Sequence, residues 1–262
     1  GPPRARNAGL ALARASLVAC MDDDVRLATD CLEKALPYFA DENVGIVETT
    51  LLIDGADRPL QIHASAQGFV TAAIFFRREA VTEVGGFDPA FFDSRTGLFF
   101  RDDADFAFRI LEAGYTALQP PDVVAWHPVQ FPGVKNSFAH VKRYMFDPLL
   151  YKKHPRLFRA YIERKRVGPF SFARPMHYSC LFFVLSIVVG CVFAVQGSSG
   201  MVWLCAVAAF IAHVGLRYKF QGVHAFKLWR VPETAAYIAL PFWYLFWLLR
   251  GVKRFGGWKS LF

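Results

Sequence analysis

Acidic residues are scarce in the second part of this 262-residue sequence. Up to Val141 there are 12 Lys and Arg residues against 19 Asp and Glu residues, whereas from Lys142 onward the counts are 18 and 3. Basic chains often bind nucleic acid, but here the basic residues alternate with long apolar stretches, and the acidic first part repels phosphate backbones. The charge pattern therefore excludes nucleic acid as a partner and favours contact with membrane lipids.

Charge is absent altogether from residues 175–216, which hold no Asp, Glu, Lys or Arg. As an α-helix this stretch would be about 63 Å long, close to two crossings of a roughly 30 Å hydrocarbon layer. The segment "QGSSG", residues 196–200, supplies a polar turn at its midpoint. We expect two transmembrane helices, at about 176–195 and 201–216. The alternative is a buried hairpin in the core of a soluble protein.

A third apolar run, about residues 234–249, is short and contains Pro241. Basic residues flank the hairpin on both sides and recur in the tail of the chain, so the positive-inside rule predicts that flanks and tail are cytoplasmic. A third full crossing would place the tail outside. We therefore expect an interfacial or re-entrant helix here, with a third membrane helix as the alternative. The protein is then a multi-pass protein of the cell membrane, with its first part in the cytoplasm.

Cysteine is sparse, and its five positions show no metal-ligand spacing: Cys20, Cys31, Cys180, Cys191 and Cys205. We expect them to serve as small apolar residues in a reducing compartment, without disulfides. There is no signal peptide and no initiating Met, and "GPPRARNAGLALARA" is already helical in pattern. We therefore expect that an N-terminal portion is missing.

Helical and strand patterns alternate up to about residue 155, which predicts an α/β fold with helices packed on a sheet. Helices are expected over the first residues, at 28–38 and at 103–113, where apolar residues recur at spacings of three and four before Gly114. The expected strands are 17–21, 43–52, 69–76 and 122–127.

Three consecutive carboxylates, Asp22, Asp23 and Asp24, follow the first expected strand. Like charges side by side cost energy unless a cation is near. The Asp-x-Asp spacing of Asp22 and Asp24 can direct two oxygens at one divalent cation, at the end of a sheet where such folds bind ligands. The alternative is that Asp24 or Thr29 caps the next helix, which accounts for one carboxylate but not for three.

A second acidic group, Asp102, Asp103 and Asp105, stands at the start of the helix expected at 103–113. A purely structural role is open, because acids are favoured at this end of a helix by about 0.3–1 kcal/mol each. The functional alternative is a general base held over a cleft. Successive helical side chains diverge by about 100°, so we expect Asp105 to point away from Asp103 and either to cap the helix or to pair with Arg109 at i+4.

In this order the two acidic blocks resemble the family 2 glycosyltransferases, which share the GT-A fold, a Rossmann-like mixed sheet flanked by helices. "GPPRARNAGLALARASLVACMDDDV" resembles the nucleotide-site block of that family. "FFRREAVTEVGGFDPAFF…RDDADFAFRILEAGY" resembles its acceptor-side block. The family's first strand has no counterpart here. We expect a GT-A domain at 1–155, lacking its N-terminal portion, a basic juxtamembrane linker at 156–175 and a membrane region at 176–262.

The resemblance implies an inverting, metal-dependent transfer of a sugar from a nucleotide-diphosphate donor to a hydroxyl of a lipid-linked or envelope glycan acceptor. It implies that Asp22 and Asp24 hold Mg²⁺ or Mn²⁺. It also implies that Arg6, Asn7 and Asp22 to Asp24, Asp23 included, lie at the nucleotide end of the donor.

On the acceptor side, Asp103 matches the family's general base. Asp102 stands beside it where the family usually has Glu, and we expect it to belong to the catalytic site and to orient the acceptor hydroxyl rather than take its proton. Phe106 stands where the family usually has Leu. His127 ends the last expected strand, where some members place a further metal or phosphate contact. The alternative is that His127 is structural.

Two other interpretations stay open. Haloacid dehalogenase-like phosphatases also begin with an apolar strand and Asp-x-Asp, but they require Thr or Val two places later, where this chain has Arg26. A membrane-anchored, non-catalytic sugar-nucleotide-binding or scaffold protein would share the fold, and the changed Asp102 is consistent with it. The fold does not name the donor sugar or the acceptor.

Overall fold

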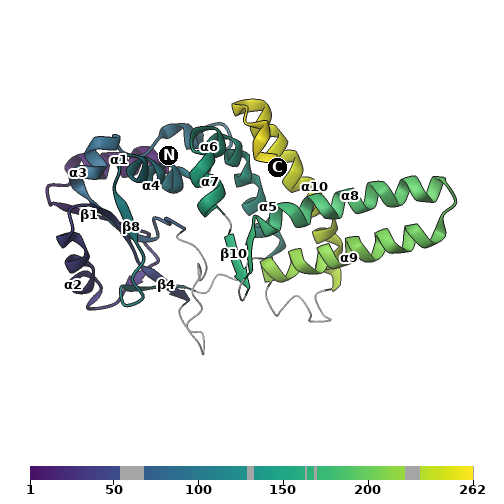
Figure 1. The fold of residues 1–262 in the computed structure, drawn as a ribbon, viewed down its shortest axis with the longest axis horizontal. Helices are drawn as coiled ribbons and strands as arrows, with labels where there is room; N and C mark the ends of the chain where they lie inside the picture. The colour runs from purple at the N-terminus through teal and green to yellow at the C-terminus, as the bar shows by residue number, and fades with distance from the viewer. Residues whose placement is uncertain (54–67, 129–132, 163, 168–169, 222–230, 262) are drawn as a thin grey trace. The chain divides into compact units, whose positions relative to one another are not determined.

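The computed structural model describes residues 1–53, 68–128, 133–162, 164–167, 170–221 and 231–261. The chain forms two compact units. The first comprises Gly1–Gln130 and Leu149–Ile162, and the second comprises Phe131–Pro148 and Glu163–Phe262. Every candidate site residue belongs to the first unit. The long apolar helices, labelled α8, α9 and α10 in Figure 1, belong to the second unit.

A four-stranded mixed sheet forms the centre of the first unit. Its strand order is β1 (Leu17–Met21), β5 (Ala73–Arg77), β3 (Val44–Glu48) and β8 (Thr116–Leu118). β5 is antiparallel to both β1 and β3, whereas β8 is parallel to β3. β1, β3 and β8 therefore run in one direction, and their carboxyl ends lie at the same edge of the sheet. The strand expected at 17–21 is confirmed.

A second sheet has three strands, in the order β2 (Arg26–Leu27), β9 (Val124–His127) and β4 (Thr50–Ile53). β9 is antiparallel to β2 and parallel to β4. The expectation of one strand over 43–52 is wrong, because the chain leaves the central sheet at Thr49 and continues in this second sheet. The Thr49 hydroxyl marks the change by donating a hydrogen bond to the Ala73 carbonyl at 2.8 Å.

Helices and short strands complete the first unit. In chain order they are α1 (Pro2–Leu12), α2 (Cys31–Ala35), η1 (Leu36–Ala40), α3 (Arg78–Val84), η2 (Pro89–Phe91), β6 (Phe92–Asp93), β7 (Leu98–Phe99), α4 (Asp102–Glu112), α6 (Asp147–Lys153), which begins in the second unit, and α7 (Pro155–Tyr161).

The helices of the first unit cover both faces of the central sheet. α2 and η1 pack against Val47 and Phe75 on one face. Phe106 of α4 packs against Phe76, with ring centroids 5.0 Å apart. Since neighbouring residues of a strand point to opposite faces, α4 covers the face opposite α2, as Figure 1 shows. This mixed sheet with helices on both sides confirms the expected α/β class.

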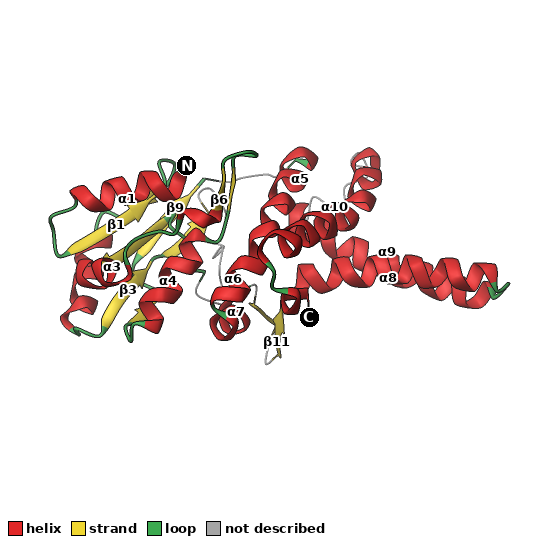
Figure 2. Ribbon diagram, turned by 90° about the horizontal axis from the view of Figure 1, so that it is seen from above, coloured by secondary structure: helices red, strands yellow, loops and turns green. Residues whose placement is uncertain are grey.

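The second unit contains two long helices, α8 (Pro175–Val195) and α9 (Ser199–Gln221), which run alongside each other as a hairpin in Figure 1 and Figure 2. Both helices are long and apolar enough to cross a membrane. Large apolar side chains such as Leu185, Trp203 and Phe210 are exposed on them, as lipid-facing residues would be. The two helices expected at 176–195 and 201–216 are thus present, the second extending further than expected.

A third long helix, α10 (Val231–Phe255), contains the expected segment 234–249 and extends beyond it at both ends, with Pro241 inside. It packs against α5 (Val134–Lys142), where the Tyr237 and Ser137 hydroxyls lie 2.8 Å apart. The unit is completed by η3 (Arg143–Phe146), the β10–β11 hairpin (Arg164–Val167 and Phe170–Ala173) and η6 (Trp258–Leu261). The interfacial or re-entrant placement of this third helix stays a prediction.

Candidate active site

The first candidate cluster lies at the carboxyl end of β1. Asp22 directly follows the strand, and its N–H donates to the Ala72 carbonyl at 3.0 Å. Asp22 is half-buried, whereas Asp23 and Asp24 are exposed. In the part of the chain that the structure describes, no Lys or Arg forms an ion pair with any of these three carboxylates. A bound cation would therefore offset their mutual repulsion.

The pairing of β2 with β9 brings His127 to this cluster, with its Nε2 3.8 Å from Asp24 Oδ1. Nδ1 lies 2.9 Å from the Pro128 carbonyl, which can only accept a hydrogen bond, so Nδ1 carries a proton. In a neutral ring Nε2 then has its lone pair free on the side of Asp24. A cation placed between this lone pair and the carboxylate would suit the arrangement.

These side chains fit a divalent cation in part. Carboxylate and imidazole are suitable ligands for Mn²⁺, and Mg²⁺ is commonly held by one or two carboxylates together with phosphates and water. Within the described residues, however, no three His, Cys, Asp or Glu side chains converge closely enough to hold a metal by themselves. Asp22, Asp24 and His127 would therefore hold an ion only together with oxygens from a bound molecule.

The second cluster is the start of α4, where the three predicted carboxylates have different surroundings. Asp102 is 3% exposed and forms an ion pair with Arg6 of α1, with 2.6 Å between Oδ2 and Nη1. Arg101, just before the helix, has a φ of 68°, a left-handed conformation that is uncommon outside glycine. Asp102 thus serves to hold α1 against the start of α4.

Asp105 is fully buried and is held on three sides. It accepts hydrogen bonds from Arg109 at 2.9 Å, from His154 at 3.1 Å and from Lys153. Burial alone would raise the pKa of Asp105, but the hydrogen bonds from His154 and Lys153 outweigh it, so the pKa is lowered. The predicted pairing of Asp105 with Arg109 is confirmed, and Asp105 is fixed inside the first unit.

Asp103 lies between these two residues and is half-buried. Its Oδ1 accepts a hydrogen bond from the N–H of Ala104 at 2.8 Å. Of the three carboxylates it is the one that retains exposure to solvent at the start of the helix. Its assignment as the general base stays a prediction.

Arg6 and Asn7 bind protein groups in this structure. The Asn7 side chain donates to the Phe87 carbonyl at 2.8 Å and accepts from the Phe87 N–H at 2.7 Å. Gly86 leaves room for it: a Cβ there would lie 2.6 Å from Asn7 Oδ1. Both residues thus tie α1 to the acceptor-side block, and their predicted place near a nucleotide stays a prediction.

Three further side chains near these clusters were not predicted from the sequence. Lys153 and His154 come from the junction of α6 and α7, and a polar pair there gives no periodic signal. Glu48 ends β3 and is 3% exposed. Burial raises the pKa of Glu48 to about 7, against the effect of backbone hydrogen bonds and with a further contribution from Asp103. A lone acid at the end of an apolar strand, "VGIVE", is the signal that could have identified Glu48.

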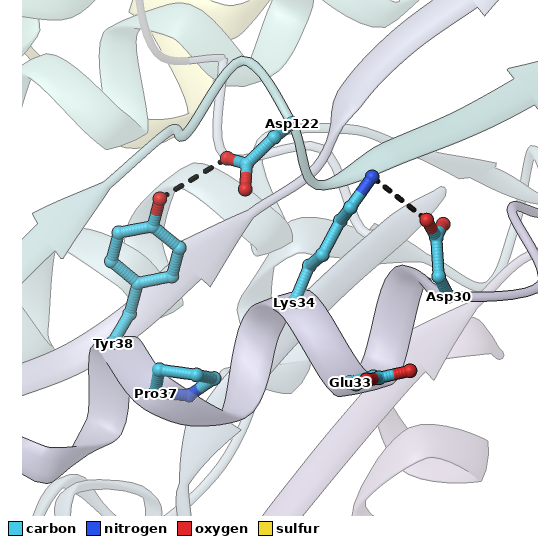
Figure 3. A pocket seen from close by; sticks show the side chains of 6 residues that line it. All are labelled: Asp30, Glu33, Lys34, Pro37, Tyr38 and Asp122. Atoms are coloured by element: carbon cyan, nitrogen blue, oxygen red, sulfur yellow. Dashed lines mark hydrogen bonds and ion pairs between the residues drawn. The ribbon is translucent and has the colours of Figure 1, made fainter.

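A separate depression of about 420 Å³ lies on α2 and η1. Figure 3 shows two pairs among its polar side chains, Lys34 with Asp30 at 2.8 Å and Tyr38 with Asp122 at 3.1 Å, and Glu33 also lines it. These four groups pair among themselves, and α2 covers the face of the sheet opposite α4. We therefore assign no ligand to this depression.

Two family profiles match the sequence. The profile described as "Glycosyl transferase family 2" matches residues 1–106, and the one described as "Glycosyl transferase family group 2" matches residues 55–255. The second match covers more than half of the chain, and together the two cover both acidic clusters and the helices α8 to α10.

Among curated proteins, the chain is similar to the pre-mycofactocin glycosyltransferases of two strains of Mycobacterium tuberculosis, CDC 1551 / Oshkosh and H37Rv. Each is 29% identical over 147 residues, which cover 48% of this chain and 30% of the relative's length. Among solved structures, it is similar to the mannosyltransferase PcManGT from Pyrobaculum calidifontis, solved with GDP-Man and Mn²⁺. That match has 21% identity and a TM-score of 0.44, and it covers 99% of this chain and 67% of the other.

Proposed function

Because the chain belongs to the family 2 glycosyltransferases, we propose that it moves a sugar from a nucleotide-diphosphate donor to a hydroxyl of a lipid-linked or envelope glycan. The observation that carries this proposal is the pair of acidic clusters in one unit. One follows a strand of the central sheet and has no Lys or Arg partner in the described chain, and the other begins the helix that covers the same sheet.

On the donor side, Asp22, Asp24 and His127 would hold Mg²⁺ or Mn²⁺ together with diphosphate oxygens. When bound, the ion would neutralise charge on the diphosphate leaving group. Asp23 is exposed beside this site and would lie near the nucleotide. Arg6 and Asn7 would support the same region from α1, through their contacts with Asp102 and Phe87.

On the acceptor side, Asp103 would accept the proton of the attacking hydroxyl. A base on the side of the anomeric carbon opposite the leaving group gives a single displacement and an inverted product. Asp102 and Asp105 would keep α4 in place, because each is engaged in buried ion pairs. Their role in the reaction is then to position Asp103.

At the membrane, α8 and α9 would anchor the enzyme, with the first unit in the cytoplasm beside its soluble nucleotide-sugar donor. The basic residues that flank the hairpin support this orientation. In this proposal residues 1–155 form the transferase domain, 156–175 the basic linker and 176–262 the membrane region. A membrane-embedded acceptor would then meet the active site at the lipid surface.

The test is a donor screen with the full-length protein in lipid nanodiscs. Nucleoside diphosphate release would be measured for a panel of UDP-, GDP- and dTDP-sugars, with Mn²⁺ or Mg²⁺ and with EDTA. We expect release with at least one donor, its loss in EDTA, and its loss in an Asp103→Asn variant. No release with any donor, alongside intact nucleotide binding, would favour a non-catalytic sugar-nucleotide-binding protein instead.

A further inference from the structure

Glu48 is a buried carboxyl group whose two oxygens have different surroundings. Its Oε1 accepts a hydrogen bond from the Val70 N–H at 3.1 Å. Its Oε2 is buried and, within the described residues, has no hydrogen-bond partner. A charged carboxylate oxygen buried in this way costs free energy, whereas a protonated carboxyl group costs much less. The surroundings of Glu48 therefore favour its neutral form.

The backbone beside Glu48 adopts an unusual conformation. Phe69 has a φ of 52°, in the left-handed region that non-glycine residues seldom occupy. The Phe69 side chain is buried against Phe108 and Tyr161, with ring centroids 5.9 Å and 5.2 Å apart. This packing holds the turn whose next residue, Val70, donates to Glu48. Backbone strain of this kind is typical of positions whose conformation is needed for function.

Glu48 lies on the side of the central sheet that α4 covers. Cys20 of β1 and Glu48 of β3 both lie opposite Ile74 of β5, so the three form one row across the sheet. Ile74 points to the same face as Phe76, which contacts Phe106 of α4. The carboxyl end of β3 therefore lies under the start of α4.

The charged groups on this side come from three elements. α4 contributes Asp103 and the Asp102–Arg6 pair, whose arginine belongs to α1. Asp22 follows β1, and β5 contributes only apolar side chains, Ile74 and Phe76, to this face. Of these groups, Asp103 is the one whose charge raises the pKa of Glu48.

We propose that Glu48 is a positioning residue for Asp103: the two carboxyl groups share one negative charge, with the proton kept on Glu48 and the charge on Asp103. Two neighbouring carboxylates do not ionise independently, and the more buried one stays protonated. Asp103 then remains a charged base in neutral solution. When Glu48 ionises at higher pH, its charge makes Asp103 a stronger base. This inference rests on the proposed function, since it takes Asp103 as the base.

The kinetic test compares wild type with Glu48→Gln across about pH 5.5–8.5. Glutamine keeps the acceptor for the Val70 N–H and cannot ionise, so the fold is preserved. We expect the kcat ratio of wild type to variant to rise by at least about threefold, with a midpoint near pH 7. In an Asp103→Asn background the same ratio should not depend on pH. If the kcat ratio does not change with pH in the protein that retains Asp103, the proposal is overturned. A merely structural role of Glu48 would lower kcat by the same factor at every pH.

A second measurement needs no turnover. Difference infrared spectra of full-length wild type minus Glu48→Gln should contain a protonated-carboxyl band that disappears as pH rises through about 7. In Asp103→Asn this loss should move to lower pH, because the neighbouring charge has gone. The proposed pairing would be overturned if the band were absent, or if it were lost at the same pH in Asp103→Asn as in wild type. The expected spectra in a protein that transfers no sugar would support the pairing and reject the proposed function.

Discussion

The three carboxylates at the start of α4 are alike in sequence but not in surroundings, and this difference determines what each substitution does. Asp103→Asn removes the proposed base and leaves the ion pairs of Asp102 and Asp105 intact. We expect turnover to fall by about 10²–10⁴-fold. Donor affinity should stay within a few-fold, because Asp103 lies on the acceptor side. A transfer assay and calorimetric titration of the nucleoside diphosphate measure the two quantities.

Asp102→Asn is the matched control for Asp103→Asn. It breaks the buried pair with Arg6, so we expect a loss of stability of about 1–3 kcal/mol and a lower melting temperature. Its effect on turnover should be smaller than that of Asp103→Asn. A large loss of turnover in Asp102→Asn, with little effect of Asp103→Asn, would mean that the base is assigned one residue too late.

At the donor site, Asp24→Asn removes the carboxylate that lies beside His127. We expect the Mn²⁺-dependent part of nucleoside diphosphate binding to fall by at least about tenfold, since a metal ligand is lost. The fold should be unaffected, because Asp24 is exposed. Titration with and without Mn²⁺ measures the effect, and Asp23→Asn is the control. Unchanged metal-dependent affinity in Asp24→Asn would exclude Asp24 as a ligand.

Contacts between residues close in sequence could be predicted, whereas contacts between residues that only folding brings together could not. The pair of Asp105 with Arg109 follows from helix geometry alone, and it is confirmed at 2.9 Å. Lys153 and His154 also bind Asp105, from more than forty positions away, and no local pattern indicates them. The contact of Arg6 with Asp102, 96 positions away, is likewise invisible in the sequence, whereas its place near the nucleotide stays a prediction.

At the scale of elements, the network around Asp105 ties α4 to α6 and α7. His154 bridges Asp105 and Glu112, at 3.1 Å and 2.9 Å, and Lys153 also binds Asp88 at 2.8 Å. These helices are separated in sequence, so the ion pairs fix where the start of α4 stands on the sheet. Disturbing Asp105 should therefore affect the stability of the whole first unit.

We predict that Asp105→Asn lowers stability by about 2–3 kcal/mol at neutral pH, since hydrogen bonds to a buried charge are lost. The pKa of Asp105 is lower in the folded protein than its ordinary value of 3.8. The charged form therefore stabilises the fold above pH 3.8, and this contribution disappears as pH falls through the lower folded pKa. Melting temperatures should differ most near pH 7 and converge in acid. A difference that persists at low pH would point to lost packing instead.

The bounds of a strand were predicted correctly where its apolar run stands apart from other apolar residues in the sequence. The run 17–21 stands alone between a helix and the carboxylates, and its bounds were right. The run 43–52 is continuous, and nothing in its periodicity reveals that it serves two sheets. The change at Thr49 depends on the Ala73 carbonyl, which belongs to β5. β8 has only three residues, too few for a pattern of its own.

At the scale of the whole molecule, composition was sufficient to predict the apolar hairpin. A stretch without charge is a property of the sequence alone, and α8 and α9 occupy it. The bounds of the third helix were harder to predict, because Glu233, Arg250 and Lys253 lie near its ends and charges of this kind usually flank a membrane segment. These charges lie within α10, and a helix with polar ends can either cross a membrane or lie along its surface.

Topology distinguishes these two placements of α10. We expect a cysteine at Ser198, in the turn between α8 and α9, to react with a membrane-impermeant maleimide in intact cells. A cysteine at Lys259, exposed in η6, should react only after permeabilisation, because the basic tail stays in the cytoplasm. All five native cysteines are free and Cys191 is exposed, so both variants must be made in a cysteine-free background. Labelling of both positions in intact cells would require α10 to cross the membrane and would reject its interfacial placement.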